Sequence, residues 1–302
     1  MASIGLKVIR GVFGAAEHIA PRLGGRAAFE LFCRTPDPKK LSAGERRAVE
    51  AARGFMAEAR HHRLKVGSGC VSVHEFRPEG HPATATVLVI HGWRSRTEYM
   101  RALIDGYRKA GFRVMSLDLP GHGGSTGRRL NMAMAVEATA AAAQWFGPFA
   151  AVVGHSFGGA VAACAASGMI KGTAPLPTER LVMIAAPNAL TDVLNGFRRH
   201  TNVGEKSARA LDKQIKRISG HPMAEFVASR YIAQMQIPTL VIHAPNDAEV
   251  PASDAKTLAA AGDHVRLLWA ENLGHRRILS DQNVVTEAVG FVEQPRQQAV
   301  VH

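Results

Sequence analysis

Cysteine is scarce in this chain. Three cysteines, Cys33, Cys70 and Cys164, occur in 302 residues, and no two of them have C-x-x-C spacing. An odd number of cysteines in this arrangement predicts neither a disulfide framework nor a zinc site. We therefore expect a fold held by a hydrophobic core, with no metal and no cofactor.

Long hydrophobic runs are also missing. No window reaches the roughly 18 uninterrupted apolar residues of a transmembrane helix, and charges interrupt residues 1–26, where a signal peptide would have an apolar centre. We therefore expect a cytoplasmic protein. Because 46% of the residues are hydrophobic, the composition is that of a globular protein of one or two domains.

Acidic residues are few relative to basic ones, and the formal net charge is +12. More than half of this excess lies in residues 1–66, which contain 13 Lys and Arg against 6 Asp and Glu. No basic motif with interleaved aromatic residues is present, so we expect no nucleic-acid partner. Near the start, apolar residues recur at helical spacing, namely Ile4, Val8, Val12, Ala16 and Ile19. A basic amphipathic helix either makes peripheral contact with a membrane or packs its apolar face on the parent domain, and periodicity does not distinguish the two.

Further along, the pattern changes from helical to alternating. A second helical stretch begins at Ser42, a residue suited to N-capping, and runs to about residue 64. In residues 64–78 apolar and polar side chains alternate on both sides of a Gly-Ser-Gly turn, which predicts a hairpin. Strands and helices then take turns, which predicts βαβ units in an α/β fold with a doubly wound, mostly parallel sheet. The expected strands are 84–93, 112–118, 150–154, 180–187, 238–247 and 264–270, and the expected helices are 97–110, 132–146, 157–169, 254–261 and 280–291.

The same pattern suggests a division of the chain. We predict a core formed by residues 66–187 and 237–294, interrupted by a helical cap at residues 188–236. Residues 1–65 are expected to form an N-terminal basic helical extension, and residues 295–302 a flexible tail.

In an open parallel sheet, ligands bind beyond the carboxyl ends of the strands. At one such end Gly154, His155, Ser156, Phe157 and Gly158 fit the pattern G-x-S-x-G, between an apolar strand and a helix of small residues. This pattern is typical of a sharp strand-to-helix turn that exposes a serine hydroxyl, and the flanking glycines remove side chains that would clash. We predict that Ser156 is a nucleophile and that His155 shapes the turn and is directed away from the hydroxyl.

A serine nucleophile needs a base and an acid that orients the base. Of the fourteen histidines, His275 lies in a glycine-containing loop after the last predicted strand. Asp247 directly follows a strand, whereas Glu249 lies further into the loop and Asp254 suits a helix N-cap. The order Ser156, Asp247, His275 is the one expected of hydrolases with this turn, and we predict that these three residues form a catalytic triad.

Acyl transfer also needs two N–H donors for the oxyanion, and losing one costs about 3 to 4 kcal/mol. We predict that the backbone N–H groups of Phe157 and Trp93 supply them. His91 and Gly92, which precede Trp93, are expected to shape the loop.

From about residue 66 to residue 291 these motifs, together with "DLPGHGGSTG" at residues 118–127, resemble the α/β-hydrolase superfamily, in particular its esterase, lysophospholipase and monoacylglycerol lipase branch. The resemblance implies an α/β-hydrolase fold and a serine carboxylesterase that works through an acyl-enzyme. It also implies that Asp118 and His122 shape the site without doing chemistry. Thioesterase, amidase or peptidase and C–C hydrolase activities use the same triad, and a non-catalytic ligand-binding homologue shares the fold, so these alternatives stay open.

The resemblance implies a small-molecule ester substrate with an apolar acyl or alcohol part. Ala208, Leu211, Ile215 and Ile218 form a helical stripe in the predicted cap, a pattern more typical of core packing than of a substrate groove. Other apolar residues of this segment are candidates to line an acyl pocket. They are Leu190, Leu194, Phe197, Met223, Phe226 and Tyr231.

Overall fold

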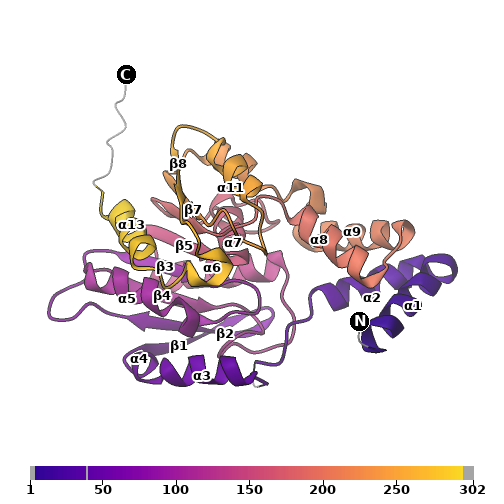
Figure 1. Cartoon of the computed structure of the whole chain (residues 1–302), viewed down its shortest axis with the longest axis horizontal. Coiled ribbons are helices and arrows are strands. Elements are labelled where there is room, and N and C mark those ends of the chain that lie inside the picture. Colours follow the sequence, from indigo (N-terminus) through magenta and orange to yellow (C-terminus); the bar gives the residue numbers. More distant parts are fainter. Residues whose placement is uncertain (1–3, 39, 295–302) are drawn as a thin grey trace.

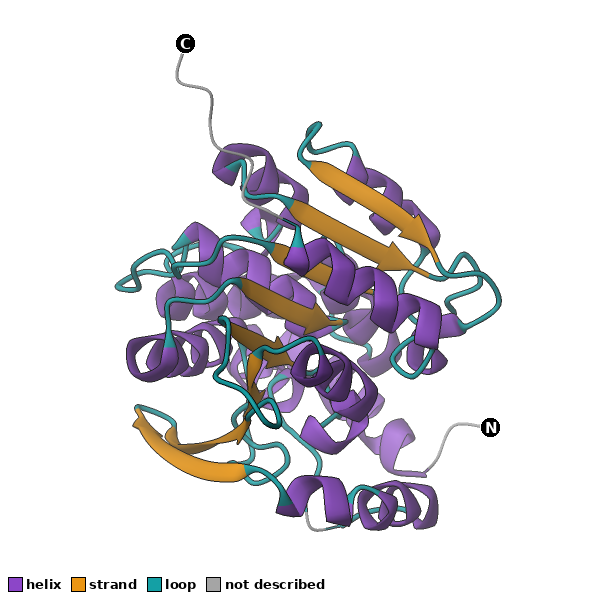
Figure 2. Cartoon of the chain, turned by 90° about the vertical axis from the view of Figure 1, so that its left-hand side faces the viewer, coloured by secondary structure: helices purple, strands orange, loops and turns teal. Residues whose placement is uncertain are grey.

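A computed structural model describes residues 4–38 and 40–294, so the predicted tail at 295–302 lies outside the described residues. Within them, eight strands form one sheet in the order β1-β2-β4-β3-β5-β6-β7-β8, and the strands from β4 to β8 in this order run parallel. The doubly wound, mostly parallel sheet is confirmed, with helices on both of its faces (Figure 2). The strands are β1 (Arg60–Val66), β2 (Gly69–Phe76), β3 (Thr86–Ile90), β4 (Arg113–Asp118), β5 (Ala151–His155), β6 (Leu181–Ile184), β7 (Thr239–His243) and β8 (Val265–Trp269).

The sheet is covered on both faces, which explains the continuous apolar runs of its parallel strands. Along β3, Val87 and Val89 belong to one buried cluster, and Leu88 and Ile90 belong to the other. The first cluster includes η1 (Thr97–Met100), α5 (Arg101–Lys109) and α13 (Gln282–Glu293). The second includes α6 (Met132–Phe146), α7 (Phe157–Ser167), α10 (Ala228–Met235) and α11 (Ala252–Ala259).

The hairpin at the edge of the sheet corrects the prediction of a helix to residue 64. Ser42 does cap a helix, since its side chain accepts the Glu45 N–H and the Glu45 carboxylate accepts the Ser42 N–H. The helical part, however, consists of α3 (Ala43–Ala51) and α4 (Arg53–Ala57), and β1 begins at Arg60 and pairs antiparallel with β2. Buried Leu64 lies opposite Val71. Pairing with a buried strand therefore overrides the helical spacing of this segment.

Four helices from two distant parts of the sequence form a projecting lobe (Figure 1). Helix α2 packs along α9, and at their contact a Cβ on Gly25 would lie 2.5 Å from the Ala210 Cβ and from the Ser207 oxygen. Glycine at this position thus allows the two backbones to approach closely. We call the four helices the helical lobe: α1 (Ile4–Ile19), α2 (Pro21–Phe32), α8 (Leu190–Thr201) and α9 (Glu205–Ser219).

The lobe divides the chain differently from the predicted scheme of a separate extension at 1–65 and a cap at 188–236. The first two helices of the extension pack on α8 and α9, whereas α3 packs on η1. Helix α10, at the end of the predicted cap, packs on α7 and α11 of the sheet layer. A short 3₁₀ helix, η2 (Met223–Glu225), connects α9 to α10. The lobe is therefore built from both segments.

Helix α1 does not bury the predicted apolar face. Its buried side chain is Phe13, and Ile4, Val8, Val12 and Ile19 are exposed. Of the two alternatives left open by the sequence, packing of this face on the parent domain is therefore not observed for these four side chains, and Ala16 is the partly buried member of the predicted face. None of the helices in residues 4–38 and 40–294 is long and apolar enough to cross a membrane.

Candidate active site

Ser156 occupies a strained turn between β5 and α7. Its backbone has φ 52° and ψ −122°, a conformation that costs an ordinary residue of order 1 to 3 kcal/mol. Two glycines make the turn possible. A Cβ on Gly154 would lie 2.3 Å from the Gly158 oxygen, and one on Gly158 would lie 2.2 Å from the Ile90 oxygen. The spacing of G-x-S-x-G thus follows from the close crossing of β3, β5 and the first turn of α7.

Asp247 and His275 lie in contact at the carboxyl edge of the sheet. The imidazole Nδ1 is 2.7 Å from Asp247 Oδ2, while Asp247 Oδ1 accepts the N–H groups of Glu249 and Val250 at 2.7 and 3.0 Å. Burial raises the pKa of the Asp247 carboxyl, but the hydrogen bonds from His275, Val250 and Glu249 lower the pKa by more, so it stays below its ordinary value. The carboxylate is therefore ionised near neutral pH and fixes a proton on His275 Nδ1.

His275 itself lies in a four-residue helix, α12 (Gly274–Arg277), where the sequence predicted a loop. Its Nε2 is 3.8 Å from the carboxylate of Glu249, which is half exposed. The hydroxyl of Ser156 makes no hydrogen bond within the described residues. The structure thus brings Asp247 and His275 together and places His155, the residue before Ser156, against His275, without a hydrogen bond between the serine hydroxyl and the imidazole. Such bonds are often long in ligand-free enzymes and tighten when substrate binds.

His155 supports the backbone of His275. Its ring centroid is 4.8 Å from that of His275, and its Nε2–H donates to the His275 carbonyl at 2.9 Å. Burial, and then the neighbouring imidazole of His275, lower the pKa of His155 to about 3. His155 is therefore neutral and directed away from the serine hydroxyl, in the shaping position that the sequence predicts.

The two predicted oxyanion donors flank Ser156. A Cβ on Gly92 would lie 3.0 Å from the Ser156 Cβ, which places the loop of Trp93 against the turn. The rings of Trp93 and Phe157 meet edge to face at 5.9 Å. Neither backbone N–H has an acceptor among the described residues. Buried His91 holds the loop in shape, because its Nδ1–H donates to the Gly92 oxygen at 2.7 Å and its Nε2 accepts the Leu119 N–H at 3.0 Å.

Asp118 and His122 hold the residues that follow this loop by hydrogen bonds, Asp118 to Thr97 and His122 to Arg94. Buried Asp118 accepts hydrogen bonds from the Thr97 N–H and hydroxyl, the Gly124 N–H and His74. Burial raises its pKa, but the bond from His74 and the charges around it lower the pKa well below its usual range. His122 donates from Nδ1 to the Pro120 oxygen and accepts the Arg94 N–H at Nε2. Both residues hold loops together rather than facing Ser156.

Buried neutral histidines predict that acid destabilises the fold. Burial, and then the neighbouring imidazole of His91, lower the pKa of His122 to about 4, below the value of about 6.5 expected in the unfolded chain. The unfolded chain therefore binds more protons between these values, so the free energy of unfolding falls as the pH falls. We expect His122 to account for about 2 kcal/mol of that loss between pH 7 and pH 5.

Urea denaturation at the two pH values measures this contribution. The His122→Asn variant should lose about 2 kcal/mol less than the wild type on acidification, whereas the matched change of exposed His81, His81→Asn, should lose as much as the wild type. An unaltered pH dependence in His122→Asn would show that His122 is not held neutral.

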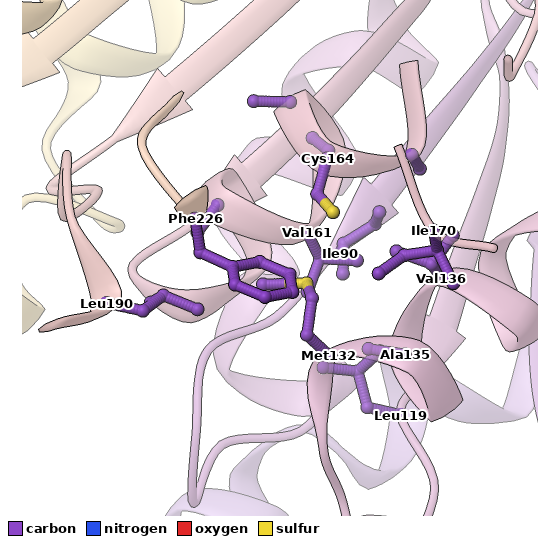
Figure 3. Packing of buried hydrophobic residues seen from close by; sticks show 14 of the residues in the cluster. Ile90, Leu119, Met132, Ala135, Val136, Val161, Cys164, Ile170, Leu190 and Phe226 are labelled. Carbon is purple, nitrogen blue, oxygen red and sulfur yellow. The ribbon is translucent and has the colours of Figure 1, made fainter. Parts of the chain in front are cut away.

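A cavity of about 450 Å³ opens over Ser156 between the sheet and the helical lobe. Its wall is mostly apolar, and in Figure 3 the ring of Phe226 points toward Met132 with Leu190 nearby. The charged side chains of the wall are Arg34 and Glu249. The lining from the lobe and the segments beside it comprises Phe29, Leu31, Phe32, Cys33, Arg34, Leu190, Val193, Phe197, Ile215, Ile218, Ser219, Met223 and Phe226, and the rest of the lining is Trp93, Leu130, Asn131, Met132, Ala133, Ser156, Phe157, Pro187, Glu249 and Val250.

Two of the six predicted pocket residues lie outside this lining. Leu194 is buried inside the lobe, because a helix turns about 100° per residue and directs the neighbouring Val193 to the cavity. Tyr231 lies on α10, where its hydroxyl donates to the Glu225 oxygen and accepts the Val227 N–H. Leu190, Phe197, Met223 and Phe226 do line the cavity.

Sequence reasoning missed several lining residues. Ile215 and Ile218 belong to the stripe interpreted as core packing, yet both line the cavity. Residues 29–34 were assigned to the extension and reach the cavity because α2 packs on α9. The paired Phe29 and Phe32 on α2 were the one local sign of an apolar face there.

Comparison with known proteins agrees with this architecture. The chain matches the sequence profile of the Alpha/beta hydrolase family over residues 87–288. No curated protein matches its sequence. Among solved structures, a membrane phospholipase A described as a bacterial virulence factor is 16% identical, has a TM-score of 0.60 and is aligned over 96% of each chain. An esterase from Exiguobacterium antarcticum is 13% identical with a TM-score of 0.58, covering 78% of this chain and all of its own (100%). The thioesterase domain from the curacin biosynthetic pathway is 16% identical with a TM-score of 0.53, covering 78% of this chain and 99% of its own.

Proposed function

The chain belongs to the alpha/beta hydrolase family, and from that premise we propose that it is a serine hydrolase that cleaves carboxylic esters with an apolar acyl part. The observation that carries the proposal is the position of Ser156. This residue lies in a strained turn on the wall of a mostly apolar cavity, and the residue before it, His155, contacts His275, a histidine that is fixed by a buried carboxylate.

In the proposed mechanism Ser156 Oγ attacks the ester carbonyl and gives its proton to His275 Nε2. The bond between Asp247 and Nδ1 leaves the lone pair of Nε2 free to accept this proton and stabilises the imidazolium that forms. The N–H groups of Trp93 and Phe157 would donate to the oxyanion. The C–O bond then breaks, His275 protonates the departing alcohol, and water activated by the same imidazole hydrolyses the acyl-serine.

The cavity supports an apolar acyl group rather than a polar one. Its wall is formed largely by aliphatic and aromatic side chains from the lobe and from α6. A buried polar substrate group would lose hydrogen bonds to water without replacing them. The similar structures include a phospholipase and an esterase, which agrees with an ester substrate, and a thioesterase domain, which makes the thioester the alternative to test.

A substrate panel tests the bond that is cleaved. We expect nitrophenyl esters to be hydrolysed with a higher kcat/KM than acyl-CoA thioesters and aminoacyl amides of matched acyl group. A higher kcat/KM for thioesters than for esters would show that the substrate is a thioester and would contradict the proposed ester substrate. Absence of turnover on the whole panel would contradict a hydrolase function.

Acyl-chain dependence tests the role of the cavity. Because burying one methylene contributes about 0.8 kcal/mol, kcat/KM should rise by up to about fourfold per methylene from acetate to hexanoate esters. The Val193→Trp variant should narrow the cavity. Its kcat/KM for the hexanoate ester should be about tenfold below the wild-type value, and its kcat/KM for the acetate ester should change little. The matched variant Arg199→Trp, on an exposed position of the same helix outside the lining, should keep the wild-type profile. A flat profile in the wild type would show that the acyl chain does not enter the cavity.

A further inference from the structure

The helical lobe carries an unusual concentration of exposed apolar side chains. Ile4, Val8, Val12 and Ile19 on α1 are 82%, 58%, 59% and 84% exposed, and Leu23 on α2 is 63% exposed. At 100° per residue the four side chains of α1 lie within one quarter of the helix circumference. We call these five residues the apolar face. Soluble monomers rarely gather exposed apolar side chains in this way unless the surface binds something.

The apolar face is not the surface by which α1 attaches to the lobe. Attachment uses the opposite side of the helix, where Phe13 is buried, Arg10 donates to the carbonyl oxygens of Arg199 and His200, and Glu17 caps the start of α9. The Glu17 carboxylate accepts N–H groups of α9 at 2.7 and 2.9 Å. Helix α1 is thus held by one side and presents the other to solvent.

The charge around the apolar face is predominantly positive, and the exposed acidic residue on the Leu23 side of α2, Glu30, is paired with Arg129. Glu17 is the single acidic residue of α1, and its carboxylate is turned inward. Lys7 and His18 lie at the margin of the face, and Arg22 and Arg26 are exposed on α2. Over α1, α2, α8 and α9 the sequence contains eleven Lys and Arg against five Asp and Glu, which is half of the net charge of +12 in about a fifth of the chain. An apolar helix face with a basic margin complements an anionic lipid surface, whereas two copies of it would repel each other.

The apolar face also leads to the cavity. Leu23, Ala27 and Leu31 follow one another at four-residue spacing along one side of α2, and Leu31 lines the cavity. Two other exposed apolar side chains of the lobe, Val193 at 50% and Ile218 at 36%, line the cavity as well. Apolar side chains therefore follow one side of α2 from Leu23 on the apolar face to Leu31 at the cavity.

We propose that the apolar face docks the protein on an anionic lipid bilayer, with α1 lying in the interface and the basic side chains contacting lipid headgroups. Docking in this way presents the cavity to acyl chains of membrane lipids. This second part rests on the proposed ester hydrolase function and makes the natural substrate a lipid ester. The docking itself depends on the surface alone.

Vesicle co-sedimentation tests the docking separately from catalysis. The full-length Ser156→Ala protein should bind vesicles of phosphatidylcholine mixed with phosphatidylglycerol. Adding Val8→Glu and Val12→Glu should weaken binding by at least about tenfold. Arg22→Gln with Arg26→Gln should weaken binding to the anionic vesicles by about fivefold per charge and change binding to pure phosphatidylcholine little. The control is Trp145→Glu, which removes a 71% exposed apolar side chain from α6 and should bind as before.

Three results would overturn the docking proposal. The first is absence of vesicle binding by the Ser156→Ala protein, and the second is equal vesicle binding by the protein that also carries Val8→Glu and Val12→Glu. The third is that light scattering finds the Ser156→Ala protein dimeric and the Val8→Glu/Val12→Glu variant monomeric, while neither binds vesicles. The last result would show that a second copy covers the face. Hydrolysis of a soluble butyrate ester by Val8→Glu/Val12→Glu in the Ser156 background should stay within about twofold of wild type, which verifies its fold. Vesicle binding without ester hydrolysis by the wild type would leave docking intact and overturn the proposed function.

Discussion

Ser156→Ala is expected to lower kcat for ester hydrolysis by 10⁴- to 10⁶-fold, the loss on the order seen when a serine nucleophile is removed. Without the hydroxyl there is no acyl-enzyme, and the remaining rate comes from substrate binding and from the N–H groups beside the turn. The fold should not change, because the Ser156 side chain makes no hydrogen bond in the described structure. Steady-state kinetics on a nitrophenyl butyrate ester, with the circular dichroism spectrum of each variant, measures the effect.

Ser219 offers a matched control in the same cavity. It also lines the cavity, but its hydroxyl lies 2.9 Å from the Ile215 oxygen and 2.8 Å from the His221 oxygen. Ser219→Ala should therefore change the rate by less than about fivefold. Comparable losses in the two variants would mean that the cavity was disturbed rather than that a nucleophile was removed. A Ser156→Ala protein of near wild-type activity would exclude Ser156 as the nucleophile.

Asp247→Asn is expected to lower kcat by about 10⁴-fold. Asparagine can keep the turn, because its oxygen can accept the Glu249 and Val250 N–H groups that Asp247 Oδ1 accepts now. Its amide nitrogen, in the place of Oδ2, would donate to His275 Nδ1 and move the imidazole proton to Nε2. That tautomer cannot accept the serine proton.

Glu249 provides the comparison for this second variant, since it is the other carboxylate near His275. It lies 3.8 Å from Nε2, is 51% exposed and is 3.3 Å from Arg276 Nε. Solvent screens such a charge, so Glu249→Gln should change kcat by less than about fivefold. If Glu249→Gln caused the larger loss of the two, the assignment of the orienting acid to Asp247 would be reversed.

The turn at Ser156 could be predicted because local chemistry determines it, and its partners could be predicted because strand order determines them. Glycine is required at positions 154 and 158 because backbone atoms lie only 2.2 to 2.3 Å from where a Cβ would be. The pattern of residues 154–158 is therefore enough to predict the turn. The parallel sheet then brings the residues that follow β7 and β8 to the same edge as Ser156. This is why Asp247 and His275, 28 residues apart, meet at 2.7 Å.

The cavity could not be predicted to the same depth, because its wall depends on contacts between distant segments. Helix α2 lines it only through packing on α9, which places Gly25 against Ala210. No local pattern in residues 21–32 specifies that partner. Within α8, the prediction included Leu194 and omitted Val193, since hydrophobicity alone does not say which apolar side of a helix faces a ligand. The first four residues of β1, 60–63, were assigned to a helix for the same reason, because their pairing with β2 is not encoded by their own spacing, whereas the hairpin predicted from residue 64 is present.

Covalent labelling of the native protein tests the central proposal, that Ser156 is an activated nucleophile, most directly. After brief reaction with a fluorophosphonate, intact-mass and peptide mass spectrometry should find one adduct, located on Ser156. The adduct should be absent in Ser156→Ala and should form far more slowly in Asp247→Asn. A folded wild-type chain that gains no adduct, or an adduct that persists in Ser156→Ala, would contradict the proposal.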